Sequence, residues 1–67
     1  MKNIGSRYFA SSFITLKSGE TLYLSNHIDD LEDKMRSKKK VIEVTTSNLF
    51  SRSYYISKNS IELYGKM

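Results

Sequence analysis

Apolar residues recur at every second position along much of this chain, and their spacing changes in one segment. Ile28, Leu31 and Met35 follow one another at intervals of three and four residues, which places them along one stripe of a helix. Acidic residues fill the first half of this segment and basic residues the second half, as the helix dipole favours. The sequence therefore predicts one helix over residues 26–39.

The flanking residues and the charges support this helix. Ser25 or Asn26 is expected to cap its N-terminus, because both side chains can accept a hydrogen bond from a free backbone N–H. Pairs of opposite charge also stand four residues apart with the acid first, an order that stabilises helices. These pairs are Asp30 with Lys34 and Glu32 with Arg36.

Short runs rich in β-branched and aromatic residues surround the helix and predict strands. Residues 7–17 have strand character, and residues 13–24 predict a β-hairpin with its turn at Gly19, a residue that tolerates positive φ. Residues 1–6 show no periodicity and are expected to form a flexible tail before a single domain over residues 7–67. Three further strands are predicted after the helix, at residues 41–46, 53–57 and 61–64.

The predicted order β-β-α-β-β-β belongs to the α+β class. Five short strands and one helix are too few for separate layers, so they predict a small, strongly bent antiparallel sheet or a partly open SH3-like barrel. A flatter sheet with the helix packed on one face is the alternative, and the sequence does not separate the two.

Two segments of the sequence resemble known small proteins. Residues 55–63 (YISKNSIEL) resemble the last two strands of small SH3-like barrels, which are separated by a single polar turn. Residues 14–20 (ITLKSGE) resemble the opening of short uncharacterised proteins carried by Gram-positive phages and plasmids. The resemblance covers about residues 13–64 and implies a fold only, because the matching residues belong to strands and turns.

Catalysis, metal binding and cofactors are not expected. A domain of 67 residues has a marginal core, which argues against a deep catalytic pocket. The chain has no Cys that could act as a thiolate nucleophile, and a single His is too few for a zinc site. His27 beside Asp29 is better explained as an exposed residue in the first turn of the helix than as a general base. The acidic residues of the helix point in several directions and predict a solvated face. We expect a protein that is not an enzyme.

The expected location is the cytoplasm. Small secreted domains usually depend on disulfides, which a chain without Cys cannot form. The apolar runs are also far shorter than the roughly 20 residues that span a bilayer. No association with a membrane is expected.

The densest charged segment is residues 34–40, with five basic residues in seven. Residues 27–40 nevertheless sum to only +1, and the whole chain carries +4, so a basic helix end explains the segment as well as a phosphate site does. A nucleic-acid-binding barrel remains the alternative function, with an exposed tyrosine stacking on bases. Its predicted residues are Arg36, Lys38, Lys39, Lys40 and Tyr55.

Tyrosines on the predicted strands suggest a protein-binding surface. Tyr54 and Tyr55 must point to opposite faces of a strand, so only one of them can enter the core. Leu49 and Phe50 lie in an expected loop and either plug the end of the barrel or form an exposed contact. The leading hypothesis is a non-catalytic module that binds a partner protein or a second copy of itself, with a homodimer as one expected form. Its predicted contact residues are Tyr23, Phe50, Tyr54 and Tyr64.

Overall fold

The structure is a computed structural model that describes residues 3–48 and 51–67. Within these ranges the chain forms six strands, one α-helix and two short 3-10 helices, so the protein is α+β, as predicted. In chain order the elements are β1 (Asn3–Ile4), η1 (Arg7–Phe9), β2 (Ser12–Leu16), β3 (Thr21–Leu24), α1 (Ile28–Arg36), β4 (Val41–Thr45), β5 (Ser53–Ser57), η2 (Lys58–Ser60) and β6 (Ile61–Lys66).

The strands form two sheets. One has four strands in the order β1-β3-β2-β6, and the other has two, β4 and β5. β1 runs parallel to β3, whereas the other pairs are antiparallel, so the larger sheet is mixed and the prediction of an antiparallel sheet is wrong in this respect. The difference comes from Asn3 and Ile4, which lie in the segment expected to be a tail and show no periodicity of their own.

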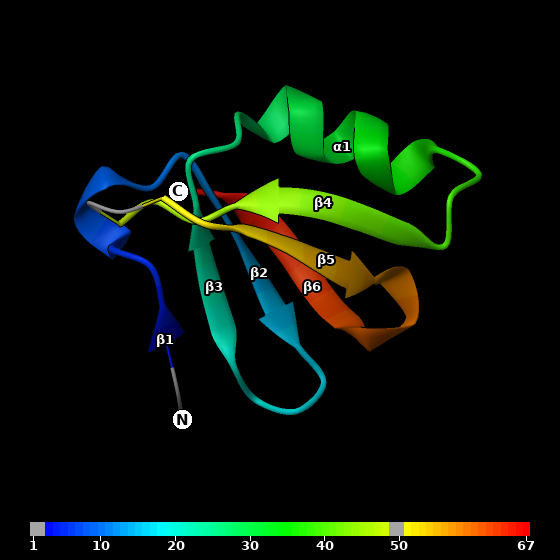
Figure 1. Cartoon of the computed structure of the whole chain (residues 1–67), viewed down its shortest axis with the longest axis horizontal. Coiled ribbons are helices and arrows are strands. Elements are labelled where there is room, and N and C mark those ends of the chain that lie inside the picture. The colour runs from blue at the N-terminus through cyan, green and yellow to red at the C-terminus, as the bar shows by residue number, and fades with distance from the viewer. Residues whose placement is uncertain (1–2, 49–50) are drawn as a thin grey trace.

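The two-stranded sheet crosses in front of the four-stranded sheet, and α1 lies along β4 (Figure 1). The end of β3 connects the sheets, because Leu24 forms a bridge with Thr46. On one side of this bridge the Ser25 N–H donates to the Thr45 carbonyl at 2.9 Å, and on the other the Ser47 N–H donates to the Tyr23 carbonyl at 3.0 Å. The strands therefore follow one bent path from β2 through β3 and β4 to β5.

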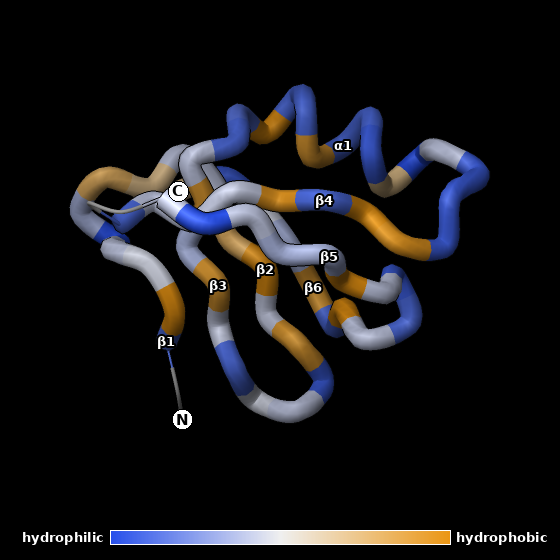
Figure 2. Tube along the Cα trace, viewed as in Figure 1, coloured by the Kyte–Doolittle hydropathy of each residue, from blue (hydrophilic) through white to orange (hydrophobic). Residues whose placement is uncertain are grey.

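The core fills the space between the two sheets and the helix. Buried positions alternate with more exposed ones along β2, β3 and β4, so each strand turns one face toward the core. Figure 2 shows the hydrophobic residues that these strands carry. The helix contributes one fully buried side chain, Leu31, with Ile28 and Met35 partly buried beside it. The strands contribute the other buried hydrophobic residues, Ile14, Leu22, Leu24, Ile42, Val44, Ile56 and Ile61.

α1 is shorter than predicted at both ends. Neither Ser25 nor Asn26 caps it; His27 does, with its Nδ1 accepting from the Asp29 N–H at 3.3 Å. His27 therefore precedes the first turn instead of lying within it. The helix ends at Arg36 because Ser37 turns away in an extended conformation, donating its N–H to the Asp33 carbonyl at 3.1 Å and its Oγ–H to the Lys34 carbonyl at 2.7 Å.

The hairpin of residues 13–24 is confirmed, with Ile14 opposite Leu22 on the buried face. Residues 7–9 form the 3-10 helix η1 and not part of a strand. The last strand was expected to be short, but β6 has six residues and continues past Gly65, because it pairs with β2 as far as Lys66 opposite Ser12. Leu49 lies outside the described residues, as does Phe50.

The chain leaves β1 through a close crossing over β3. Gly5 has a φ of 91°, and a Cβ built on it would collide with the Tyr23 carbonyl oxygen. Ser47 is buried at the same crossing and donates its Oγ–H to the Ser6 carbonyl at 2.6 Å. Only glycine fits here, because it has no Cβ and tolerates positive φ without strain.

Candidate interaction surfaces

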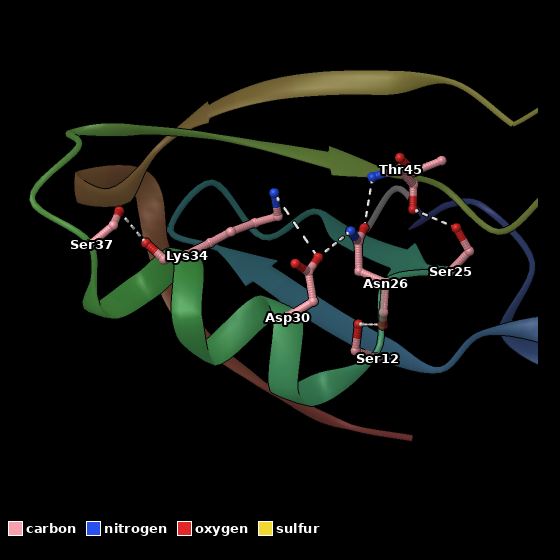
Figure 3. A network of polar contacts seen from close by, with 7 residues as sticks. All are labelled: Ser12, Ser25, Asn26, Asp30, Lys34, Ser37 and Thr45. Atoms are coloured by element: carbon pink, nitrogen blue, oxygen red, sulfur yellow. Dashed lines mark hydrogen bonds and ion pairs between the residues drawn. The ribbon is translucent and has the colours of Figure 1, made fainter.

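A polar network fixes the N-terminal end of α1 between the two sheets (Figure 3). The Asn26 Oδ1 accepts from the Thr45 N–H at 2.8 Å, and its Nδ2 donates to the Asp30 carboxylate at 2.9 Å. The Asn26 carbonyl accepts from the buried hydroxyl of Ser12 at 2.7 Å. The network therefore joins β2, the start of α1 and β4.

The outer face of the four-stranded sheet carries an aromatic pair. Ile14 opposite Leu22 points into the core, so Phe13 opposite Tyr23 points the other way. Leu16 donates its N–H to the Glu20 carbonyl, and hydrogen-bonded pairs alternate with non-hydrogen-bonded pairs along an antiparallel ladder. Phe13 and Tyr23 therefore form a non-hydrogen-bonded pair, in which the two side chains lie closer together. Both residues are partly exposed.

This aromatic pair extends onto β6. β2 pairs with β3 on one side and with β6 on the other, and on the β6 side Gly65 stands opposite Phe13. A Cβ built on Gly65 would lie 3.1 and 3.2 Å from two atoms of the Phe13 ring. The ring of Phe13 therefore occupies the space that a side chain at Gly65 would take. Leu63 stands opposite Thr15, two residues along β2 from Phe13, and so lies on the same face of the sheet; it is 49% exposed. We call the surface of Phe13, Tyr23 and Leu63 the aromatic face.

The predicted protein-binding residues do not share one surface. Tyr23 lies on the aromatic face, whereas Tyr64 stands opposite Ile14 and so points to the other side of the sheet at its edge. Tyr54 stands opposite Val44 and packs partly buried against the core. Phe50, the fourth residue predicted to bind a partner, lies outside the described part of the chain. Phe13 and Leu63 were missed, because which strands lie side by side cannot be read from local spacing.

A second surface is an open groove of about 480 Å³ between the end of α1 and the outer face of β4 and β5. Tyr55, 75% exposed, stands directly opposite Glu43 on its wall. Asp33, Lys34 and Lys39 also line it, so two acidic and two basic residues balance each other. The groove offers an aromatic ring in surroundings without net charge.

The basic residues predicted to bind nucleic acid lie at the end of α1 and in the segment that follows it. Arg36 is at the end of α1, with its Nη2 3.2 Å from the Glu32 carboxylate. Lys38, Lys39 and Lys40 follow the helix in an exposed segment, so their predicted position in its last turns is wrong. Of these residues, Lys39 lines the groove together with Tyr55. The predicted pairs at Glu32–Arg36 and Asp30–Lys34 are both present, the latter at 4.0 Å.

Two further aromatic side chains are exposed on η1. Tyr8 is 84% and Phe9 80% exposed, and the Arg7 guanidinium lies 5.8 Å from the centre of the Tyr8 ring. Phe9 lines an open, mostly apolar depression with Ser6 and Ser47, whose volume of about 480 Å³ equals that of the groove beside Tyr55. The sequence pattern placed these aromatic residues in a strand, and the 3-10 turn exposes them instead.

Among residues 3–48 and 51–67, no three His, Cys, Asp or Glu side chains gather in a way that could hold a metal ion. In the same part of the chain, α1 is too short and too polar to cross a membrane, and no other helix is long enough. No protein-family model, curated protein or solved structure matches the chain.

Proposed function

We propose that this protein is a non-catalytic interaction module that binds a partner protein through the aromatic face. The observation that carries the proposal is the partly exposed row of Phe13, Tyr23 and Leu63 on the side of the sheet turned away from the core. Tyrosine and phenylalanine supply large contact areas at a low cost in conformational entropy, which is why aromatic residues anchor protein interfaces.

We also propose that the fold is a partly open SH3-like barrel. The path from β2 to β3, across the Leu24–Thr46 bridge to β4 and β5, and back through η2 to β6 beside β2 supports this assignment. The barrel is open because β5 pairs with β4 and β6 pairs with β2, so the two strands belong to different sheets and are joined only by the single turn η2. The assignment is in keeping with the resemblance to small proteins of Gram-positive phages and plasmids. The absence of Cys from the sequence favours a cytoplasmic protein.

Site-specific photo-crosslinking tests the protein-binding function. A benzophenone amino acid placed at Tyr23 or Leu63, in cells that make the protein naturally, is expected to give an adduct of the same discrete mass from both positions. The matched control carries the probe at Asp29, which is exposed on the helix. Introducing Leu63→Asp should reduce the Tyr23 adduct at least about tenfold, since the loss of a hot-spot residue near the centre of an interface costs about 2 kcal/mol or more. Equal adducts from all three positions, or none from positions 23 and 63, would contradict the proposal.

Nucleic-acid binding is the second candidate function, favoured by the presence of Tyr55 and Lys39 in one groove. A base stacked on the exposed ring of Tyr55 would leave its phosphates near Lys34 and Lys39. Asp33 and Glu43 oppose this arrangement, because their carboxylates repel phosphate in the same groove. Protein binding is therefore the better supported function.

Titration with a fluorescent single-stranded oligonucleotide at two salt concentrations tests this second candidate. If the groove binds nucleic acid, Lys38→Glu, Lys39→Glu and Lys40→Glu together should abolish binding. Tyr55→Ala should weaken it roughly tenfold or more, as expected for the loss of one stacked base. The affinity of the unaltered protein should also fall steeply with salt. Binding that the triple variant retains, or no binding at low salt, would exclude the groove as a nucleic-acid site.

A further inference from the structure

β6 leaves one edge of the four-stranded sheet without a strand partner in the described part of the chain. It is the last strand in the order β1-β3-β2-β6, and its six residues make it the longest strand described. An edge strand of this length presents a row of unpaired backbone groups that can pair with another strand. Its outer edge is therefore a candidate binding site for an extended segment.

The hydrogen bonds of the sheet show which backbone groups of β6 point outward. Met67 donates its N–H to the Ser11 carbonyl at 3.3 Å, and in an antiparallel ladder such bonded pairs recur every two residues. Gly65 and Leu63 thus bond to β2, and the N–H and C=O groups of Tyr64 and Lys66 point away from it. Glu62 lies at the register shift of this ladder and is exposed.

We propose that a second copy of this chain occupies the edge, with the two β6 strands antiparallel and Tyr64 of each copy on the two-fold axis. In this register Tyr64 exchanges both backbone hydrogen bonds with the partner's Tyr64, as the outward groups require. Glu62 then stands opposite the partner's Lys66, and this favourable pair occurs twice. Moving the axis to Glu62 or to Lys66 would place like charges opposite each other, so charge complementarity selects the register.

The side chains of the outer face fit the same register. Leu63 falls opposite the partner's Gly65, which has no side chain and over which a phenylalanine ring lies. The exposed half of Leu63 would therefore pack beside that ring, and the aromatic faces of the two copies would join across one eight-stranded sheet. The inference deepens the proposed interaction function, on which it rests, by naming one partner.

The other strand edges fit a second copy less well. In the pair of β4 and β5, the backbone groups of Arg52 and Lys58 bond to the β4 side. The backbone N–H and C=O groups that point away from β4 are therefore those of Ser53, Tyr55 and Ser57. Pairing two copies about Tyr55 would place Arg52 opposite the partner's Lys58, twice, and these like charges repel. The other edge of β4 is occupied at its end by Ser25 and Asn26, and β1 has only two residues.

Charge exchange across the axis provides the test, read out as molar mass by light scattering over a range of concentrations. The unaltered chain should dimerise as its concentration rises. Glu62→Lys alone and Lys66→Glu alone should each weaken the dimer about tenfold, because both cross-strand pairs become repulsive. An equimolar mixture of the two variants should dimerise again, since every Lys then faces a Glu. Both positions are exposed, so circular dichroism should show unchanged folding.

Amide hydrogen exchange distinguishes this edge from any other dimer contact. The amides of Tyr64 and Lys66 should become protected only at concentrations where the dimer forms, whereas Leu63 and Gly65 should be protected at every concentration. The inference is overturned if the unaltered chain stays monomeric, if the mixture fails to restore the dimer, or if Tyr64 exchanges freely in a dimer. If the Glu62→Lys variant with the photo-crosslinking probe at position 23 still forms an adduct with a different protein, the proposed function stands without this dimer.

Discussion

Replacing Leu31 by alanine is expected to lower the free energy of unfolding by about 2–5 kcal/mol, the usual cost of truncating a fully buried leucine. Leu31 is the one residue of α1 that is completely buried, and the helix covers the core mainly through it. A domain of this size has a total stability of only about 3–10 kcal/mol, so the substitution removes a large part of it. Urea denaturation followed by circular dichroism measures the change.

Two controls separate the loss of packing from a general effect on the helix. Leu31→Met keeps most of the volume and should cost less than about 1.5 kcal/mol. Asp33→Ala changes an exposed position later in the same helix and should stay within roughly 0.5 kcal/mol. A loss below about 1 kcal/mol for Leu31→Ala would mean that α1 does not seal the core as described.

Replacing Gly5 by alanine is the second substitution expected to have a large effect. The positive φ of Gly5 strains any other residue by about 1–3 kcal/mol, and the new Cβ would also collide with the Tyr23 carbonyl. That carbonyl accepts the Ser47 N–H, so a backbone shift would disturb the junction of β1, β3 and β4 together. Thermal unfolding should show a lower Tm, and hydrogen exchange should show lost protection at Ser47.

Gly19 is the matched control, because its φ of 97° in the turn between β2 and β3 imposes a similar strain. Gly19→Ala should therefore destabilise the protein by the conformational term alone. If the two alanine variants lose the same stability, the close crossing at Gly5 contributes nothing beyond its backbone angle.

Part of the candidate surface followed from the sequence. The rule that adjacent strand residues point to opposite faces predicted that one of Tyr54 and Tyr55 would be exposed, and Tyr55 is. The same alternation in the hairpin places Tyr23 away from Leu22 and Leu24. Phe13 and Leu63 could not be recognised as neighbours, because they are 50 positions apart and meet only through the pairing of β2 with β6.

The elements with a local sequence signal could be predicted: the hairpin of β2 and β3, the strands β4 and β5, and a helix with Leu31 on its apolar stripe and ion pairs one turn apart. These follow from periods of two and of three to four residues, which short segments express alone. Three features depend instead on contacts between distant segments. Asn3 and Ile4 form β1 beside β3, the helix ends before Ser37, whose carbonyl oxygen accepts from the Lys58 ammonium, and Leu24 of β3 bridges to Thr46 after β4. Their hydrogen bonds join residues about 20 positions apart, and a contact between distant segments leaves no periodic trace in either one.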